Sequence, residues 1–233
     1  MRAAAKAKEK RRQALVQGGL IAGVVVIVVA IVVGVLLQRD TTARSIVGAP
    51  VGTNSEGGIY AGTATSPVTL TMIEDFQCPI CREFETANKA LLDNYAKPGS
   101  RVRLEYRPIA FLDSMSSTKY SSRALNAAAC VQAADPEDWR DFHNLLYANQ
   151  PAEQSAGLTD DDLTDLAAEA GVPRDKVASC ITGNSYAKWV KSTTDVATHL
   201  SYFQGTPTVL VNGKKIDSPA SKAIEAAVAA ARK

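Results

Sequence analysis

The feature that most constrains the fold is Cys78-Pro79-Ile80-Cys81, which stands between a strand-like and a helix-like segment. Residues 68–73 alternate branched and apolar side chains, a pattern that predicts a strand. Residues 78–95 place apolar and aromatic side chains at near-helical spacing and predict a helix. Two cysteines three residues apart at such a junction indicate reversible thiol–disulfide chemistry, because the start of a helix stabilises a thiolate.

The two cysteines have different expected roles. Cys78 would begin the helix, where unpaired N–H groups and the helix dipole favour negative charge. Pro79 suits the first turn because it has no N–H to leave unpaired. Cys81 follows less than one turn later and should be the more buried. We therefore expect Cys78 to be the nucleophile and Cys81 the resolving thiol.

The other segments follow an α/β order. Residues 101–106 predict a second strand, and about residues 114–200 are helical in pattern. Residues 208–211 predict a strand, Asn212-Gly213 is a type I′ hairpin signal, and an Ala-rich helix ends near residue 231. This order predicts an α/β domain with an all-helical insertion.

An uncharged run covers residues 13–38, and its centre is almost entirely Val, Ile, Leu, Ala and Gly. About 20 apolar residues cross a bilayer, whereas the apolar part of a cleaved signal peptide has about 7–15. We expect a transmembrane anchor at residues 18–37, with a cleaved signal peptide or a buried helix as alternatives. No small-residue cleavage site follows the run.

The charge pattern gives the topology. The chain has 26 Lys and Arg against 24 Asp and Glu, but six basic residues lie within residues 1–12. The positive-inside rule places a basic tail, residues 1–17, in the cytoplasm. Residues 38–66 would then be a flexible linker and residues 67–233 an extracytoplasmic domain. That domain is mildly acidic, which argues against a nucleic-acid partner.

Four cysteines, Cys78, Cys81, Cys130 and Cys180, allow three pairings into two disulfides in an oxidising compartment. The Cys78–Cys81 motif could also be half of a zinc site. The remaining ligands would come from Cys130, Cys180, His143 or His199, which lack paired-ligand spacing, so we expect no metal. A purely structural Cys78–Cys81 disulfide is a further alternative.

Four motifs, in order, resemble the DsbA family of thioredoxin-fold thiol–disulfide oxidoreductases. They are residues 75–81 after the first strand, residues 142–150 in the helical insertion, residues 204–208 before the hairpin, and residues 209–213. The resemblance covers about residues 66–230. The anchor and the second cysteine pair make the chain most similar to membrane-tethered DsbA-like proteins of actinobacteria.

The resemblance implies a thioredoxin fold with a cis Thr206–Pro207 bond lying against the dithiol. It implies a dithiol oxidase that acts on exported proteins with reduced cysteines. A membrane oxidase of the DsbB or vitamin K epoxide reductase type would reoxidise it, and no small-molecule cofactor is required. The alternatives are a disulfide isomerase or reductase, or a non-catalytic chaperone or scaffold.

Two positions depart from the family. The residue six before the first cysteine is commonly a buried acid that accepts a proton, but here it is Met72, and whether Glu74 or Asp75 replaces it is left open. The enteric DsbA pair encloses Pro-His, whereas Ile80 supplies no charge or donor. We expect a Cys78 pKa less depressed than that of a Pro-His relative.

The remaining singled-out residues have structural interpretations. Cys130 and Cys180 fall in different helices of the insertion, and we expect them to form a structural disulfide, with an electron relay as the alternative. His143 is expected to pack against apolar neighbours, and His199 could lie close to the dithiol. Trp139 and Trp189 are expected in the core.

Overall fold

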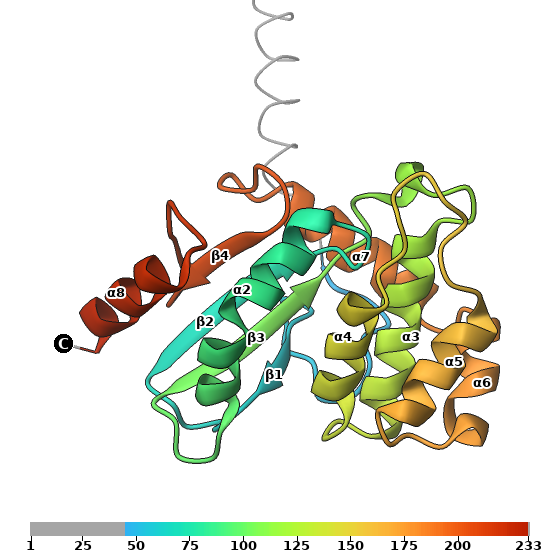
Figure 1. Cartoon of the computed structure of the whole chain (residues 1–233), viewed down its shortest axis with the longest axis horizontal. Coiled ribbons are helices and arrows are strands. Elements are labelled where there is room, and N and C mark those ends of the chain that lie inside the picture. The colour runs from blue at the N-terminus through green and yellow to red at the C-terminus, as the bar shows by residue number, and fades with distance from the viewer. Residues whose placement is uncertain (1–44, 233) are drawn as a thin grey trace, which may run out of the picture. The chain divides into compact units, whose positions relative to one another are not determined.

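The central strand is β2 (Val68–Glu74), in a five-stranded sheet of order β1-β3-β2-β4-β5 (Figure 1). The computed structural model describes residues 45–232. β2 runs parallel to β3 (Val102–Pro108) and antiparallel to β4 (Thr208–Val211). A strand buried on both faces needs a nearly continuous apolar run. In β2, Val68, Leu70, Met72 and Ile73 are fully buried.

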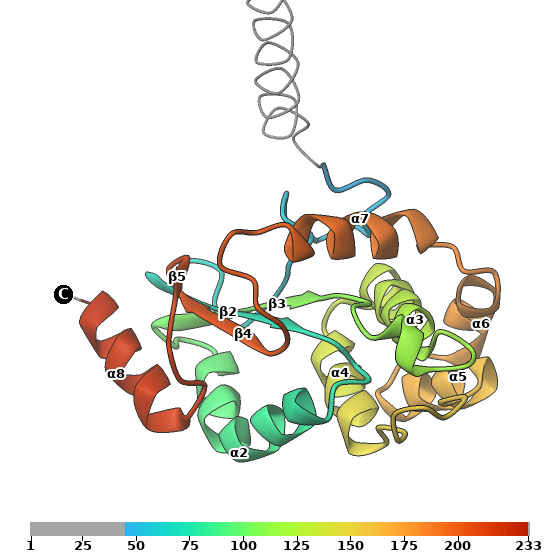
Figure 2. The same ribbon diagram turned by 90° about the horizontal axis from the view of Figure 1, so that it is seen from above.

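Helices cover both faces of the sheet. α2 (Pro79–Ala96) connects β2 to β3, because parallel neighbours require a crossover. Figure 2 shows α2 and α8 (Ser221–Ala231) on one face and α7 (Ala187–Thr198) over the other. The inward face of α2 carries Cys81 and Phe84.

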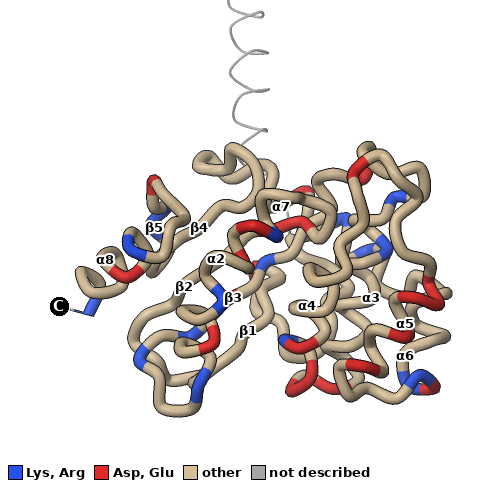
Figure 3. The backbone as a smooth tube through the Cα atoms, in the orientation of Figure 1, with Lys and Arg blue, Asp and Glu red and all other residues tan. Residues whose placement is uncertain are grey.

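The helical insertion lies beside the sheet, between β3 and β4 in sequence. Its elements are η1 (Asp113–Met115), α3 (Tyr120–Ala134), α4 (Trp139–Ala148), α5 (Asp160–Glu169), α6 (Arg174–Thr182) and α7. α3 is almost wholly buried, and Trp139 and Trp189 are core residues, as expected. Acidic residues gather on α5 (Figure 3), whose Thr159–Asp162 capping box closes its first turn.

The predicted α/β order with a helical insertion is confirmed. The hairpin between β4 and β5 (Lys214–Lys215) is also confirmed, since Asn212 at φ 46° and Gly213 at φ 76° adopt the positive angles of a type I′ turn.

The segment expected to be a flexible linker, residues 38–66, contains β1 (Ile59–Ala61), which pairs antiparallel with β3. Ile59 is 1% exposed. The Val47 N–H donates to Ser192 Oγ at 3.1 Å, and Gln132 Nε2 donates to the Val51 carbonyl at 3.2 Å. From Val47 onward, this segment is therefore part of the domain.

The expected anchor at residues 18–37 and basic tail at residues 1–17 lie outside the described residues. Between residues 45 and 232, no helix combines the length and apolar character needed to cross a bilayer.

Candidate active site

Cys78 is the N-cap of α2, four residues after the end of β2. Its backbone is extended, with φ −74° and ψ 116°, and Pro79 occupies the first turn. The Cys78 N–H donates to the Asp75 carbonyl at 2.9 Å, and the Cys78 carbonyl accepts from the Cys81 N–H at 3.1 Å. This turn places Cys78 at the start of α2, where the first N–H groups have no helical partner.

The two free thiols have opposite electrostatic properties. A hydrogen bond from the Cys81 thiol, assisted by Thr206 and by backbone N–H groups, lowers the pKa of Cys78 to about 6 against the opposing effect of burial. Burial raises the pKa of Cys81 well above its usual range, and the hydrogen bond to Cys78 and the charge of Glu74 add to this effect. At neutral pH the reduced pair therefore holds a Cys78 thiolate beside a neutral Cys81 thiol.

The loop before β4 forms a second wall of the site. The Thr206–Pro207 peptide bond is cis. The Cys78 thiol lies 3.5 Å from the Thr206 carbonyl oxygen, across 128 residues of sequence. The arrangement implied by the resemblance is therefore present, with the loop directly against the first cysteine.

Polar side chains that the sequence patterns did not assign hold the turn before α2. Gln150 Nε2 donates to the carbonyls of Phe76 at 3.0 Å and of Cys78 at 2.9 Å. Asp75 accepts from the Gln77 N–H at 2.8 Å and from the Ser121 hydroxyl at 2.7 Å. Burial raises the pKa of Asp75 to about 6 despite these bonds. Gln150 ends residues 142–150, one of the four motifs that resemble the DsbA family. The helical spacing of that motif did not indicate that the Gln150 side chain reaches the dithiol.

Three buried polar side chains lie behind the dithiol. They are Glu74 at the end of β2, Glu85 on α2 and His143 on α4, and their ligand atoms lie within 4.8 Å of one another. His143 Nε2 is 3.5 Å from Glu74 Oε2. Burial raises the pKa of Glu74 and of Glu85 to about 8 and lowers that of His143. Met72, which stands where the family commonly has an acid, is an apolar core residue. Of the two candidates to replace that acid, Glu74 belongs to this buried group and Asp75 does not.

Glu85 was not singled out from the sequence. It follows Cys81 by four residues, and residues four apart share one helix face, so the spacing could have located it. Acids are rarely buried unless they are paired, so a search for apolar residues at helical spacing does not find them. His143 packs as expected, with its ring centroid 4.5 Å from that of Tyr106 and 5.0 Å from that of Tyr147.

A sequence model described as Thioredoxin matches residues 54–230, which is most of the chain. The chain belongs to the thioredoxin family.

Two relatives place this thioredoxin-family chain among DsbA-like proteins. It is 29% identical to reduced DsbA from Mycobacterium tuberculosis, with a TM-score of 0.59, covering 81% of this chain and 100% of that one. It is 26% identical to disulfide bond formation protein D of Bacillus subtilis (strain 168) over 162 residues, covering 69% of this chain and 70% of that protein. The domain is therefore of the DsbA-like thiol–disulfide oxidoreductase type.

A third relative is much longer. The Na(+)/H(+) antiporter NhaA 3 of Salinispora tropica is 30% identical over 171 residues, which are 73% of this chain but 24% of the antiporter. The chain thus spans about a quarter of that relative.

In this thioredoxin-family site, Ile80 is 54% exposed. His199 lies at the end of α7, exposed, with Nδ1 2.8 Å from the Asp195 carbonyl oxygen. Among the hydrogen bonds of residues 45–232, His199 makes none to the dithiol.

Cys130 on α3 and Cys180 on α6 form a disulfide, which is the pairing expected from the sequence. It joins two helices of the insertion across 50 residues. The alternative zinc site would have taken its remaining ligands from Cys130, Cys180, His143 or His199. The sulfurs of Cys130 and Cys180 are bonded to each other and are not free to bind a metal ion.

Glu74, Glu85 and His143 form the one set within residues 45–232 whose ligand atoms are close enough for a metal ion. A metal site also needs a complete set of ligands and an access path. All three side chains are buried, and aromatic rings surround His143.

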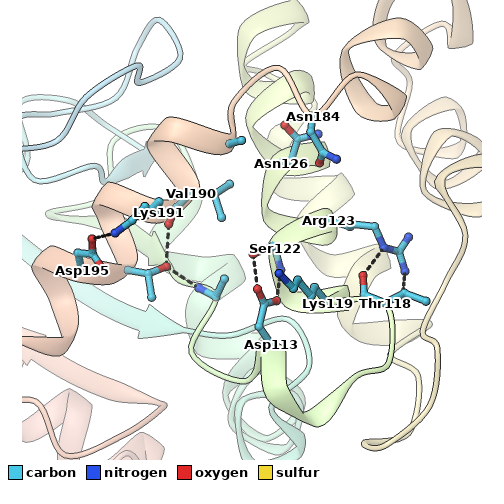
Figure 4. A pocket seen from close by; sticks show the side chains of 13 residues that line it. Asp113, Thr118, Lys119, Ser122, Arg123, Asn126, Asn184, Val190, Lys191 and Asp195 are labelled. Carbon is cyan, nitrogen blue, oxygen red and sulfur yellow. Dashed lines mark hydrogen bonds and ion pairs between the residues drawn. The ribbon is translucent and has the colours of Figure 1, made fainter.

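The thioredoxin-family domain has a further cleft of about 480 Å³ between α3 and α7 (Figure 4). Some of its polar side chains bind one another: Asp113 accepts from the Ser122 hydroxyl, and Lys191 pairs with Asp195. Neither cysteine of the dithiol lines it.

Proposed function

We propose that this chain is a membrane-anchored, extracytoplasmic dithiol oxidase that introduces disulfides into exported proteins. The observation that carries the proposal is the position of Cys78 at the start of α2, against the Thr206 carbonyl and beside the buried Cys81, where the pKa of Cys78 is lowered. Stabilising the Cys78 thiolate stabilises the reduced pair, and this makes the disulfide form more oxidising.

The reaction exchanges one disulfide for another. A client thiolate attacks Cys78 Sγ of the oxidised pair, the Cys78–Cys81 bond breaks, and Cys81 leaves as a thiolate that takes up a proton. A second client thiolate then attacks the client sulfur of the mixed disulfide. The client disulfide forms, and Cys78 leaves as the stabilised thiolate.

Exposed apolar side chains near the dithiol suit unfolded clients. Ile80 is 54% exposed, and Phe111 is 45% exposed with its ring centroid 5.4 Å from that of Phe203. Phe111 follows β3, whose C-terminal end lies beside that of β2 because these strands are parallel. The Thr206 backbone offers polar groups to an extended client segment.

Reoxidation would be carried out by a membrane oxidase of the DsbB or vitamin K epoxide reductase type, which accepts the two electrons of the reduced pair. The apolar run at residues 18–37 and the basic residues before it support an anchor with the catalytic domain outside.

Three assays on the full chain in detergent test the activity. They are the reduction potential of Cys78–Cys81, refolding of reduced ribonuclease, and refolding of scrambled ribonuclease. We expect an oxidising potential and faster refolding of the reduced client. Faster refolding of the scrambled client alone would support an isomerase.

Mixed disulfides test catalysis in cells. Cys81→Ala should accumulate client proteins bound to Cys78, and Cys78→Ser should accumulate none and lose function. A Cys78→Ser variant with intact function would instead support a chaperone or scaffold.

Protease protection tests the topology. In intact cells with a permeabilised outer layer, protease should remove the catalytic domain and spare residues 1–17. Protection of the domain would contradict the proposed orientation.

A further inference from the structure

The Asp75 carboxylate connects three segments of the chain at the active site. Its Oδ1 accepts from the Gln77 N–H at 2.8 Å and from the Ser121 hydroxyl at 2.7 Å, which ties the turn before Cys78 to the start of α3. Its Oδ2 accepts from the Leu112 N–H at 2.8 Å. Asp75 is fully buried, and a buried carboxylate needs such donors. The two oxygens therefore hold different parts of the site in one fixed arrangement.

Leu112 belongs to the loop after β3 that carries Phe111. This loop is held on both sides of the Phe111 ring, because the Ala110 N–H donates to Thr194 Oγ1 on α7 at 2.9 Å and the Leu112 N–H donates to Asp75. The Phe111 side chain itself is 45% exposed. The two hydrogen bonds fix the backbone before and after Phe111, so its exposed ring has a set position.

The Phe111 ring leads back to the dithiol through the loop before β4. Its centroid lies 5.4 Å from that of Phe203, and the two rings meet edge to face, which is a favoured aromatic geometry. Phe203 precedes Thr206 by three residues, and the Thr206 carbonyl oxygen lies 3.5 Å from the Cys78 thiol. The contacts thus form a closed ring in which Asp75 supports both the aromatic pair and the turn that carries Cys78.

A protein client and a small thiol need different parts of this ring. Both attack the sulfur of Cys78, but only an unfolded client has apolar segments to bury against Phe111 and Phe203. Burial of apolar surface favours binding only where the two surfaces meet closely. A displaced Phe111 ring would therefore weaken the reaction with a client more than the reaction with a small thiol.

We propose that Asp75 is a positioning residue that makes the dithiol selective for protein clients over small thiols. Through the Leu112 N–H it holds Phe111 where an apolar client segment meets the aromatic pair while the client sulfur reaches Cys78. The inference rests on the proposed thiol–disulfide function and deepens it.

The test compares two reductants of the oxidised dithiol in single turnovers, with the full chain in detergent. Reduced ribonuclease is the protein client and glutathione is the small thiol. Asp75→Asn keeps one oxygen for Gln77 and Ser121 but turns an amide NH₂ toward the Leu112 N–H. The ratio of the ribonuclease rate constant to the glutathione rate constant should fall by about fivefold or more. Most of the fall should come from a higher half-saturating concentration of ribonuclease.

Two further variants test whether Asp75 acts through Phe111. Phe111→Ala should lower the same ratio, and adding Asp75→Asn to it should lower the ratio little further, because both changes remove one interaction. The matched control is Asp141→Asn, the same change at an exposed acid on α4, which should behave as wild type. Losses that multiply in the double variant, or an equal loss with both reductants, would overturn the proposal.

Thr194→Val decides the question if Asp75→Asn folds poorly. It is nearly isosteric and removes the acceptor of the Ala110 N–H on the α7 side, so it should loosen the Phe111 loop without touching the turn at Cys78. It should lower the ratio in the same way, and a wild-type ratio in every folded variant of this loop would overturn the proposal. If the oxidised wild-type dithiol accepted electrons from neither reductant, the proposed function would fail instead.

Discussion

Two residues, Pro79 and Ile80, stand between the cysteines, and Ile80 is the more exposed to solvent. It gives the Cys78 thiolate no donor and no charge, so the lowered pKa of Cys78 comes from Cys81, Thr206 and the helix N–H groups. A substitution at Ile80 can therefore change the pKa of Cys78 and the reduction potential of the dithiol.

Ile80→His should raise the reduction potential of the dithiol, because a protonated imidazole would stabilise the Cys78 thiolate. A rise of about 30 mV corresponds to about 1.4 kcal/mol of added preference for the reduced form. Equilibration with glutathione measures it, with Ile80→Val as the control. An unchanged potential in Ile80→His would count against the argument.

The stability that the Cys78 thiolate contributes to the reduced protein should be lost as pH falls from about 9 to about 6. The pKa of Cys78 is about 6 in the folded protein against an ordinary 9.0, so its contribution is complete above the higher value and is lost through the lower one. Glu74 and Glu85 act in the opposite direction. Their pKa rises from 4.5 to about 8, so their contribution is lost as pH rises.

Urea unfolding of reduced wild type and of reduced Cys78→Ala separates the two effects. The difference in free energy of unfolding between the two proteins should grow from pH 6 to pH 9, since both retain the two acids. A constant difference would contradict the lowered pKa of Cys78.

Residue patterns predicted the dithiol and its two unlike thiols. They left open whether Glu74 or Asp75 is the acid behind it, and they missed Glu85. Cys78 and Cys81 are recognisable because their spacing and position carry the chemistry. Glu74 ends a strand and Glu85 interrupts an apolar helix face, and acids at such positions are usually exposed. Their burial depends on α4, which packs against α2 from more than 50 residues away.

At the scale of elements, the start of α2 is held by another helix. Gln150, just after α4, donates to two carbonyls of the turn that carries Cys78. The position of the thiol therefore depends on the packing of α4 as well as on the local turn.

Gln150→Leu should lower the free energy of unfolding by about 1–3 kcal/mol, because the Phe76 carbonyl loses its donor and the Cys78 carbonyl keeps only backbone donors. It should also change the reduction potential, since the turn that holds Cys78 loosens. Denaturant titration and glutathione equilibration measure the two effects. Glu153→Gln, a substitution at a nearby exposed residue, should change neither the stability nor the potential. If Gln150→Leu matched wild type in both, Gln150 would not hold the turn.

Long elements with strong patterns were predictable, and β1 was not. β2 and α2 carry apolar repeats of their own, and the β4–β5 hairpin has its Asn212-Gly213 signal. β1 has three residues in a segment rich in Gly, Ser and Thr. It is a strand because Ile59 pairs with Tyr106 of β3, and such a tertiary contact leaves no local periodicity.

At the scale of the whole molecule, the Cys130–Cys180 disulfide stabilises the insertion separately from the dithiol. It links α3 to α6 and closes a loop of 50 residues.

Replacing both cysteines by alanine should lower the free energy of unfolding by about 4 kcal/mol in the chain-entropy model. The reduction potential of Cys78–Cys81 should stay the same. Thermal unfolding and glutathione equilibration provide the two readouts. A shifted potential would instead favour a relay between the two pairs.

The active site joins distant parts of the chain, because Thr206 lies 128 residues after Cys78 and β4 completes the centre of the sheet after the whole insertion. A ribosome makes the chain from its N-terminus, so the redox cysteines exist long before their opposing wall. An unfinished copy has free thiols and an unpaired edge on β2. Catalytic competence is therefore acquired only near the end of synthesis.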